Sequence, residues 1–171
     1  MSEAVFKIED LATILKQMKQ RRDRGKSTKG CTLLIGAGCS ITGNIPGAPK
    51  IIERIKEDYP YPYSQVPSTC HPEELYGECM SKLTTDERQD LFEQLNEKAT
   101  INQAHLYIAA LMEAGYINRI MSVNFDNLLV RACALVHLFP AIYDLTVAPS
   151  TADYGAIDQQ AIFYLHGQIK G

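Results

Sequence analysis

The sequence predicts an α/β protein with a parallel sheet flanked by helices. Short apolar runs at 31–35, 117–123 and 161–165 are typical of buried parallel strands. Segments with helical spacing separate these runs, and this alternation favours crossover connections. The length of 171 residues suits one domain, and a hydrophobic content of 46% excludes a disordered chain.

The remaining elements follow from periodicity and from turn residues. Thr84 with Glu87 three residues later predicts a capping box, and Gly115 is expected to end the helix before it in a left-handed conformation. The segment 59–68 contains three prolines and is expected to be a loop. Residues 141–147 are expected to form a weak strand. Helices are expected over 8–22, 47–58, 72–82, 85–98, 103–114 and 126–137.

The first 29 residues differ in charge from the rest of the chain. Residues 16–29 carry seven basic side chains and one Asp, whereas residues 30–171 carry nine basic and sixteen acidic ones. We therefore divide the chain into an N-terminal amphipathic helix with a basic linker, residues 1–29, and a main domain, residues 30–171. A solvated helix end explains the basic stretch most simply. Binding of nucleic acid or of a membrane surface by this stretch stays open as an alternative.

The cysteines and the apolar segments indicate the cellular compartment of the protein. Five cysteines at irregular spacing, with no C-x-x-C motif, favour a reducing environment and give no reason to expect a metal. No apolar run is long enough for a transmembrane helix, and the N-terminus has no signal-peptide pattern. We expect a cytoplasmic protein without a membrane partner.

Polar or glycine-rich clusters follow three of the predicted strands. Ligands of open parallel sheets bind outside the carboxyl ends of the strands, so three such clusters predict one shared crevice. Glycines after the first strand would let the backbone approach a diphosphate. A histidine after the last strand could exchange a proton with water or a sugar hydroxyl. The clusters are Gly36-Ala37-Gly38-Cys39-Ser40, Asn124-Phe125-Asp126 and His166-Gly167.

Each cluster also has a purely structural interpretation. The glycines could form a tight turn between a strand and a helix, and Ile41 stands where a full G-x-G-x-x-G motif has its last glycine. Asn124 and Asp126 are residue types that cap helices. His166 could simply be a packed or exposed residue. These alternatives stay open for each cluster taken alone.

Taken together, the three clusters resemble the sirtuin family. The order and the spacing of the three clusters are those of the sirtuin motifs: Gly-Ala-Gly-Cys-Ser followed by Ile45-Pro46, then Asn-Phe-Asp, then His-Gly. The segment that begins at Asn102-Gln-Ala-His105 is similar to the one that precedes the second motif. The resemblance covers residues 30–170 and implies a Rossmann-like parallel sheet.

One departure points to a particular branch of that family. Sirtuin deacylases continue Ile-Pro with Asp-Phe-Arg, whereas this chain continues with Gly47-Ala48-Pro49. In this glycine variation and in its Asn-Phe-Asp form, the chain is more similar to the divergent sirtuin-like domains of bacterial anti-phage defence proteins. That resemblance implies an NAD glycohydrolase, which cleaves NAD to nicotinamide and ADP-ribose and depletes the cell of NAD. It also implies a homo-oligomer, or a sensor or activator protein that is fused or bound.

The resemblance also implies roles for individual residues. Asn124 would position a water or the nicotinamide ribose, Asp126 would contact the nicotinamide carboxamide, and His166 would be the general base. No metal is required. The NAD-binding residues implied by the first motif are Gly36, Ala37, Gly38, Ser40, Ile45 and Pro46, among which Ala37, Gly38 and Ser40 would contact the phosphates and the adjoining ribose.

Two other functions remain as alternatives. The domain could be an NAD-dependent protein deacylase, or it could bind NAD or ADP-ribose without turnover as a sensor or assembly module. In sirtuins, strands after the His-Gly motif hold the adenosine half of NAD, whereas Gly167 lies four residues before the last one given. We therefore expect a fragment of a larger protein, in which the C-terminal part of the sheet is missing.

Overall fold

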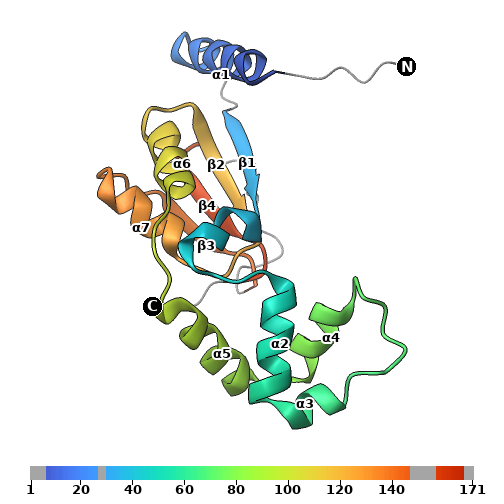
Figure 1. The fold of residues 1–171 in the computed structure, drawn as a ribbon. Helices are drawn as coiled ribbons and strands as arrows, with labels where there is room; N and C mark the ends of the chain where they lie inside the picture. The colour runs from blue at the N-terminus through green and yellow to red at the C-terminus, as the bar shows by residue number, and fades with distance from the viewer. Residues whose placement is uncertain (1–6, 27–29, 147–156, 168–171) are drawn as a thin grey trace, which may run out of the picture.

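The fold is an α/β arrangement built on one four-stranded parallel sheet, seen in a computed structural model that describes residues 7–26, 30–146 and 157–167 (Figure 1). The strand order is β1-β2-β4-β3, and every neighbouring pair is parallel. This topology is Rossmann-like and confirms the predicted fold class. The strands are β1 (Cys31–Ile35), β2 (Ile117–Ser122), β3 (Ala141–Asp144) and β4 (Ala161–Tyr164).

The register of the sheet aligns the ends of three strands. Ile35 pairs with Ser122, and Ser122 pairs with Tyr164. The pairing continues beyond the strands, because Val123 N–H donates to the Ile35 carbonyl (3.1 Å) and Leu165 N–H donates to the Ser122 carbonyl (2.9 Å). The segments that follow β1, β2 and β4 therefore start from the same edge of the sheet, as the sequence predicts.

Two helices, α6 (Gln103–Glu113) and α7 (Leu128–Leu135), pack against one another, and their inward side chains join the main core of the sheet (Figure 1). The predicted end of α6 is confirmed, because Gly115 has a φ of +76°. Helix α7 starts two residues later than predicted, since the Asp126 carboxylate accepts the Leu128 N–H (3.1 Å) and closes a turn first. The buried members of this core include Ile35, Ala109, Met112, Ile120, Leu129, Ala132, Ile162 and Tyr164.

A separate layer of four helices lies beyond the carboxyl edge of the sheet (Figure 1). The helices are α2 (Ala48–Asp58), α3 (Pro60–Ser64), α4 (Leu75–Lys82) and α5 (Thr85–Glu97). The predicted capping box of α5 is confirmed, because Glu87 N–H donates to Thr84 Oγ1 (3.3 Å) and Thr84 N–H donates to Glu87 Oε2 (2.7 Å). This layer has its own core of buried side chains: Ile51, Ile55, Cys79, Leu83 and Leu91.

The expectation of a loop over 59–68 is wrong at Pro60–Ser64, which form α3. Prolines do not prevent this helix, because N–H groups in the first turn have no intrahelical partner in any case. Pro60 and Pro62 both fall within that turn. Tyr63 packs against the core of the helical layer, and this burial holds the short helix in place.

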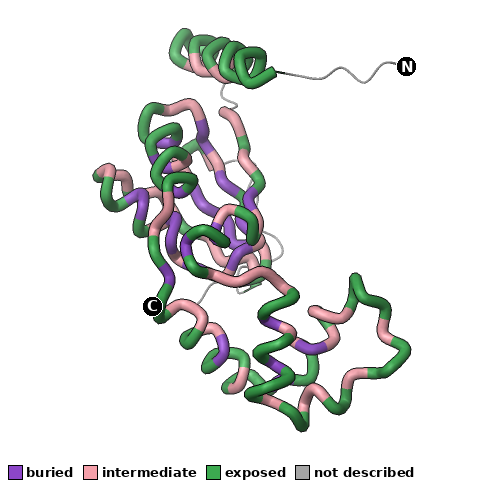
Figure 2. The backbone as a smooth tube through the Cα atoms, viewed as in Figure 1, coloured by how far each residue is buried: buried purple, intermediate pink, exposed green. Residues whose placement is uncertain are grey.

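Helix α1 (Ile8–Asp23) lies at the opposite, amino-terminal edge of the sheet, and Figure 2 shows it largely exposed. Arg22 Nη2 donates to the Gly115 carbonyl (2.6 Å), and Lys19 Nζ lies 5.9 Å from the centre of the Tyr116 ring. The helix predicted over 8–22 is confirmed, whereas residues 27–29 of the basic linker lie outside the described residues. Within the described ranges, no helix is both long enough and apolar enough to cross a membrane.

Candidate functional site

The loop that follows β1 consists of two short 3₁₀ turns, η1 (Ala37–Cys39) and η2 (Ile41–Gly43). The backbone of the glycine loop therefore forms the tight turns of the structural interpretation. Gly36 is extended, with a φ of −139°. A Cβ atom on Gly38 would meet nothing within 4 Å, so this residue faces open space. Among the described residues, the N–H groups of Ala37 and Gly38 have no backbone acceptor.

Ser40 ends η1 and is the centre of a buried hydrogen-bond cluster. Its side chain is completely buried, and its hydroxyl donates to Asp126 Oδ2 (2.8 Å). Ser40 Oγ also accepts a hydrogen bond from Asn124 Nδ2 (3.0 Å) and lies 3.3 Å from His105 Nε2. One hydroxyl therefore joins the glycine loop, the segment after β2 and helix α6. We call Ser40, His105, Asn124 and Asp126 the Ser40 cluster.

The hydrogen bonds of His105 define its protonation. The Asn102 N–H donates to His105 Nδ1 (3.3 Å), so the ring proton must lie on Nε2, from which it is donated to Ser40. Burial lowers the pKa of His105, although the nearby Asp126 carboxylate opposes this effect. His105 is therefore neutral at pH 7 and acts in this cluster as a fixed donor.

Asp126 has both structural and site-forming contacts. Its Oδ1 accepts the N–H of Leu128, the first residue of α7, and its Oδ2 accepts from Ser40. The helix-cap interpretation is wrong in position, because Asn127 is the N-cap and Asp126 closes the turn before the helix. The Tyr164 hydroxyl donates a hydrogen bond to the Asp126 main-chain carbonyl (3.1 Å). Burial raises the pKa of Tyr164, and the negative charge of Asp126 raises it further. Each carboxylate oxygen can accept a second hydrogen bond, so Asp126 keeps acceptor capacity for a ligand.

A pocket of about 150 Å³ lies between the carboxyl edge of the sheet and the helical layer. It includes six of the predicted site residues: Ala37, Ser40, Ile45, Pro46, Asn124 and Asp126. The helical layer and the segment after β2 complete the wall, mainly with apolar groups. Within the described part of the chain, Asp126 is the only carboxylate in the lining, and no Lys or Arg takes part. The other lining residues are Ala48, Ile51, Tyr76, Phe92, Leu95, Asn96, Val123 and Phe125.

Two aromatic rings form part of this wall. Phe92 of α5 and Phe125 from the segment after β2 are stacked, with ring centres 4.7 Å apart and an interplanar angle of 30°. The pair joins the helical layer to the sheet edge. Its apolar faces, together with one carboxylate, suit a flat ligand group that carries positive charge.

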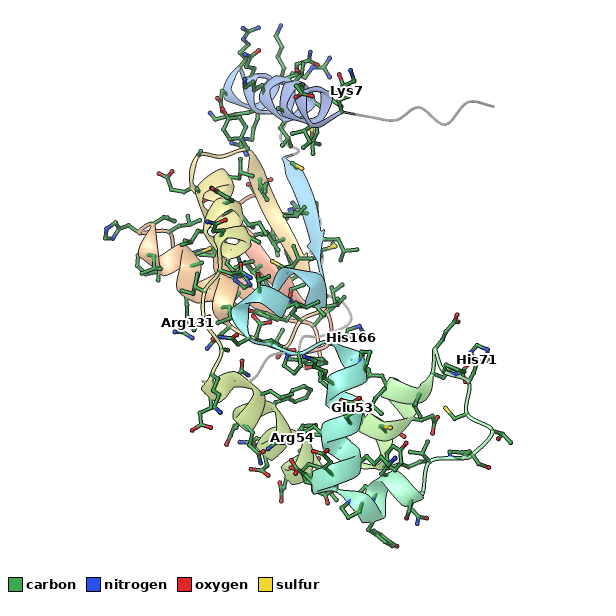
Figure 3. The ribbon with its side chains drawn as sticks, in the orientation of Figure 1. Lys7, Glu53, Arg54, His71, Arg131 and His166 are labelled. Atoms are coloured by element: carbon green, nitrogen blue, oxygen red, sulfur yellow. The ribbon has the colours of Figure 1, made fainter. Side chains whose placement is uncertain are left out.

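The structure does not place His166 in the pocket lining. His166 is exposed and lies two residues beyond β4, at the carboxyl edge of the sheet (Figure 3). Gly36 and Gly38 are also absent from the lining, although their loop supplies Ala37 and Ser40. Six of the predicted site residues thus line the pocket, whereas Gly36, Gly38 and His166 lie outside its lining.

The sequence analysis does not identify His105 or Asn102 as site residues. Asn102 accepts the His105 N–H (3.1 Å) as the N-cap of α6, and its Nδ2 donates to the Cys39 carbonyl (2.8 Å). The Asn-x-x-His spacing at the start of an apolar helix is the signal that could have pointed to both. The aromatic wall from α5 has no sequence signal, because it depends on how the helical layer packs.

No group of three or more His, Cys, Asp or Glu side chains in the described segments is arranged to hold a metal ion. Comparison of the chain with protein-family models and with curated protein sequences finds no match. The function of this chain must therefore be inferred from the side chains of the site and from the motifs that supply them.

Proposed function

We propose that this chain carries the catalytic site of an NAD glycohydrolase, which cleaves NAD to nicotinamide and ADP-ribose. The observation that carries the proposal is the Ser40 cluster, which forms one side of a pocket at the carboxyl edge of a parallel sheet. Three of its four members, Ser40, Asn124 and Asp126, come from two of the three motifs that resemble sirtuin sequences, and His105 comes from α6. The closer resemblance to anti-phage defence domains suggests that the cellular effect is NAD depletion.

The chemistry of the pocket supports a site for the nicotinamide end of NAD. The nicotinamide ring of NAD is flat and positively charged, and the pocket offers the stacked Phe92 and Phe125 rings and the Asp126 carboxylate. The N–H groups of Ala37 and Gly38 in the adjoining loop have no backbone acceptor among the described residues and are suitable donors for the diphosphate. The ligand would therefore extend from the pocket across the glycine loop.

In the proposed reaction, the bond between ribose C1′ and the nicotinamide nitrogen breaks, and its electron pair neutralises the ring. A water molecule adds to C1′ and loses a proton, which gives ADP-ribose. Asn124 is held by its Nδ2 bond to Ser40, which leaves the amide oxygen as an acceptor that can orient this water. His166, which lies outside the pocket lining, would accept the water proton.

The test is to incubate NAD with the chain and separate the products by chromatography, with and without an acetyl-lysine peptide. We expect nicotinamide and ADP-ribose without the peptide, and no turnover with Asn124→Ala or His166→Ala. His71→Ala is the matched control, because His71 is an exposed histidine in the helical layer (Figure 3). Full turnover by both site variants would refute the proposal, and turnover that requires the peptide would instead indicate a deacylase.

The position of His166 favours one second candidate. A site whose base lies outside the pocket lining could bind NAD or ADP-ribose without cleaving it, as a sensor does. Calorimetric titration of both ligands distinguishes the two functions. Tight binding with no product would support the sensor, and loss of binding in Asn124→Ala would assign that binding to the same pocket.

A further inference from the structure

Helix α1 is more exposed than its sequence pattern requires. None of its 16 residues is buried, and Ile8, Leu11 and Ile14 are 83%, 55% and 43% exposed. An isolated helix of this length is only marginally stable in water, and most helices depend on the packing of an apolar face. The bonds from Lys19 and Arg22 hold only the C-terminal end of α1 to its own domain.

The apolar side chains of α1 form one continuous stripe. Ile8, Leu11, Leu15 and Met18 are separated by three, four and three residues, which is the spacing of the a and d positions of a coiled coil. Ile14 widens the stripe on one side. Of these side chains only Leu15 and Met18 are partly covered, and the N-terminal half of the stripe is exposed, with no burying contact from the described residues.

We propose that α1 pairs with α1 of a second copy of this chain, in antiparallel orientation. The charges along the helix favour this partner and this direction. Residues 8–15 carry two acidic and no basic side chains, whereas residues 16–23 carry four basic side chains and one Asp. A parallel pair would place the two basic halves together, while an antiparallel pair places each basic half beside an acidic half.

The attachment of α1 to its domain favours the same arrangement. Lys19 and Arg22 fix the C-terminal end, so antiparallel helices place the two domains at opposite ends of a helix pair about 24 Å long. A parallel pair would bring both domains to the same end. With the stripe centred near residue 13, Ile8 faces Met18 of the second copy and Leu11 faces Leu15 of that copy.

The first test is sedimentation of the chain over a range of concentrations. We expect a reversible dimer, and we expect Leu11→Glu to weaken it at least about tenfold, because two desolvated leucines are lost per dimer. Phe139→Glu is the matched control, since Phe139 is 80% exposed and lies outside α1. A monomer at all concentrations, or a dimer equally strong in Leu11→Glu, would overturn the proposal.

The second test examines orientation and does not depend on the stability of the Leu11 variant. Chains with Ile8→Cys and chains with Met18→Cys are mixed, oxidised and mapped by mass spectrometry. Antiparallel pairing predicts links between positions 8 and 18, and links between two copies of position 8 would overturn it. A monomer that binds nucleic acid with a strong salt dependence would also overturn it, and would assign the basic half of α1 to that role.

Discussion

Replacing Ser40 by alanine tests whether the Ser40 cluster holds the site together. The substitution removes one oxygen atom that serves three neighbours: Asp126, Asn124 and His105. These side chains are 6%, 7% and 1% exposed, so water does not reach them freely from outside. A buried polar group without a partner costs about 1–3 kcal/mol.

The magnitude follows from how many of the three groups stay unpaired. Asn124 and Asp126 both border the pocket, where a water molecule can replace the lost hydroxyl, which leaves His105 Nε2 as the costly group. We therefore expect a loss of about 1–3 kcal/mol in the free energy of unfolding. For a chain of this size, such a loss lowers Tm by about 2–12 °C.

The assay is urea unfolding of the wild type and of Ser40→Ala, with the slope m compared to verify that the transition is the same. Ser81→Ala is the control, because the Ser81 hydroxyl makes an exposed bond to the Glu78 carbonyl. We expect the control to stay within about 0.5 kcal/mol of the wild type. A Ser40 variant that is equally stable would refute the central position of this hydroxyl.

Three further predictions concern the ligand and the pH. Gly38→Ala should fold normally but raise the KM for NAD, because the new methyl group projects into the open space where the diphosphate would lie. Gly77→Ala is the control, since its methyl group also has no neighbour within 4 Å, and it should leave the KM unchanged. Equal KM values in the two variants would contradict a diphosphate at this loop. Burial lowers the pKa of His105, so on acidification the unfolded chain binds this proton first, and stability should fall as the pH drops below about 6.5. The Tm of the wild type should therefore exceed that of His105→Gln by a margin that narrows from pH 7 to pH 5. A margin that stays constant over this pH range would exclude this explanation. Calorimetry should show weaker binding of NADH than of NAD, because the reduced ring is uncharged and gains less from Asp126; equal affinities would exclude a nicotinamide site at this carboxylate.

The sequence predicts the sheet and its edge well because both follow from local patterns. The apolar runs before residues 36, 124 and 166 are short and bounded, which identifies them as buried parallel strands. Parallel pairing then requires their carboxyl ends to share one edge, so the meeting of the glycine loop with the Asn-Phe-Asp segment could be predicted without coordinates. The capping residues Thr84 and Gly115 were predictable for the same reason, since each acts within its own turn.

What the sequence does not predict depends on contacts between distant segments. His105 reaches Ser40 across 65 positions of the chain, and the Asn-x-x-His spacing at the start of its helix does not identify that distant partner. The helix α3 forms in spite of three prolines in its segment, because Tyr63 finds a core that other helices create. The absence of His166 from the pocket lining likewise depends on how its loop leaves the sheet, which no pattern in the sequence describes.

The composition of the pocket limits how a dinucleotide could bind here. Among the described residues that line it there is one carboxylate and no basic side chain, so the negative diphosphate gains nothing inside the pocket. If NAD is the ligand, its diphosphate would instead lie over the glycine loop, where the backbone N–H groups of Ala37 and Gly38 could donate to it. The positive ring would then be the part of NAD that the Asp126 carboxylate attracts. Because the Ser40 cluster joins that loop to Asn124, it would fix the distance between the bound diphosphate and the water that attacks the ribose.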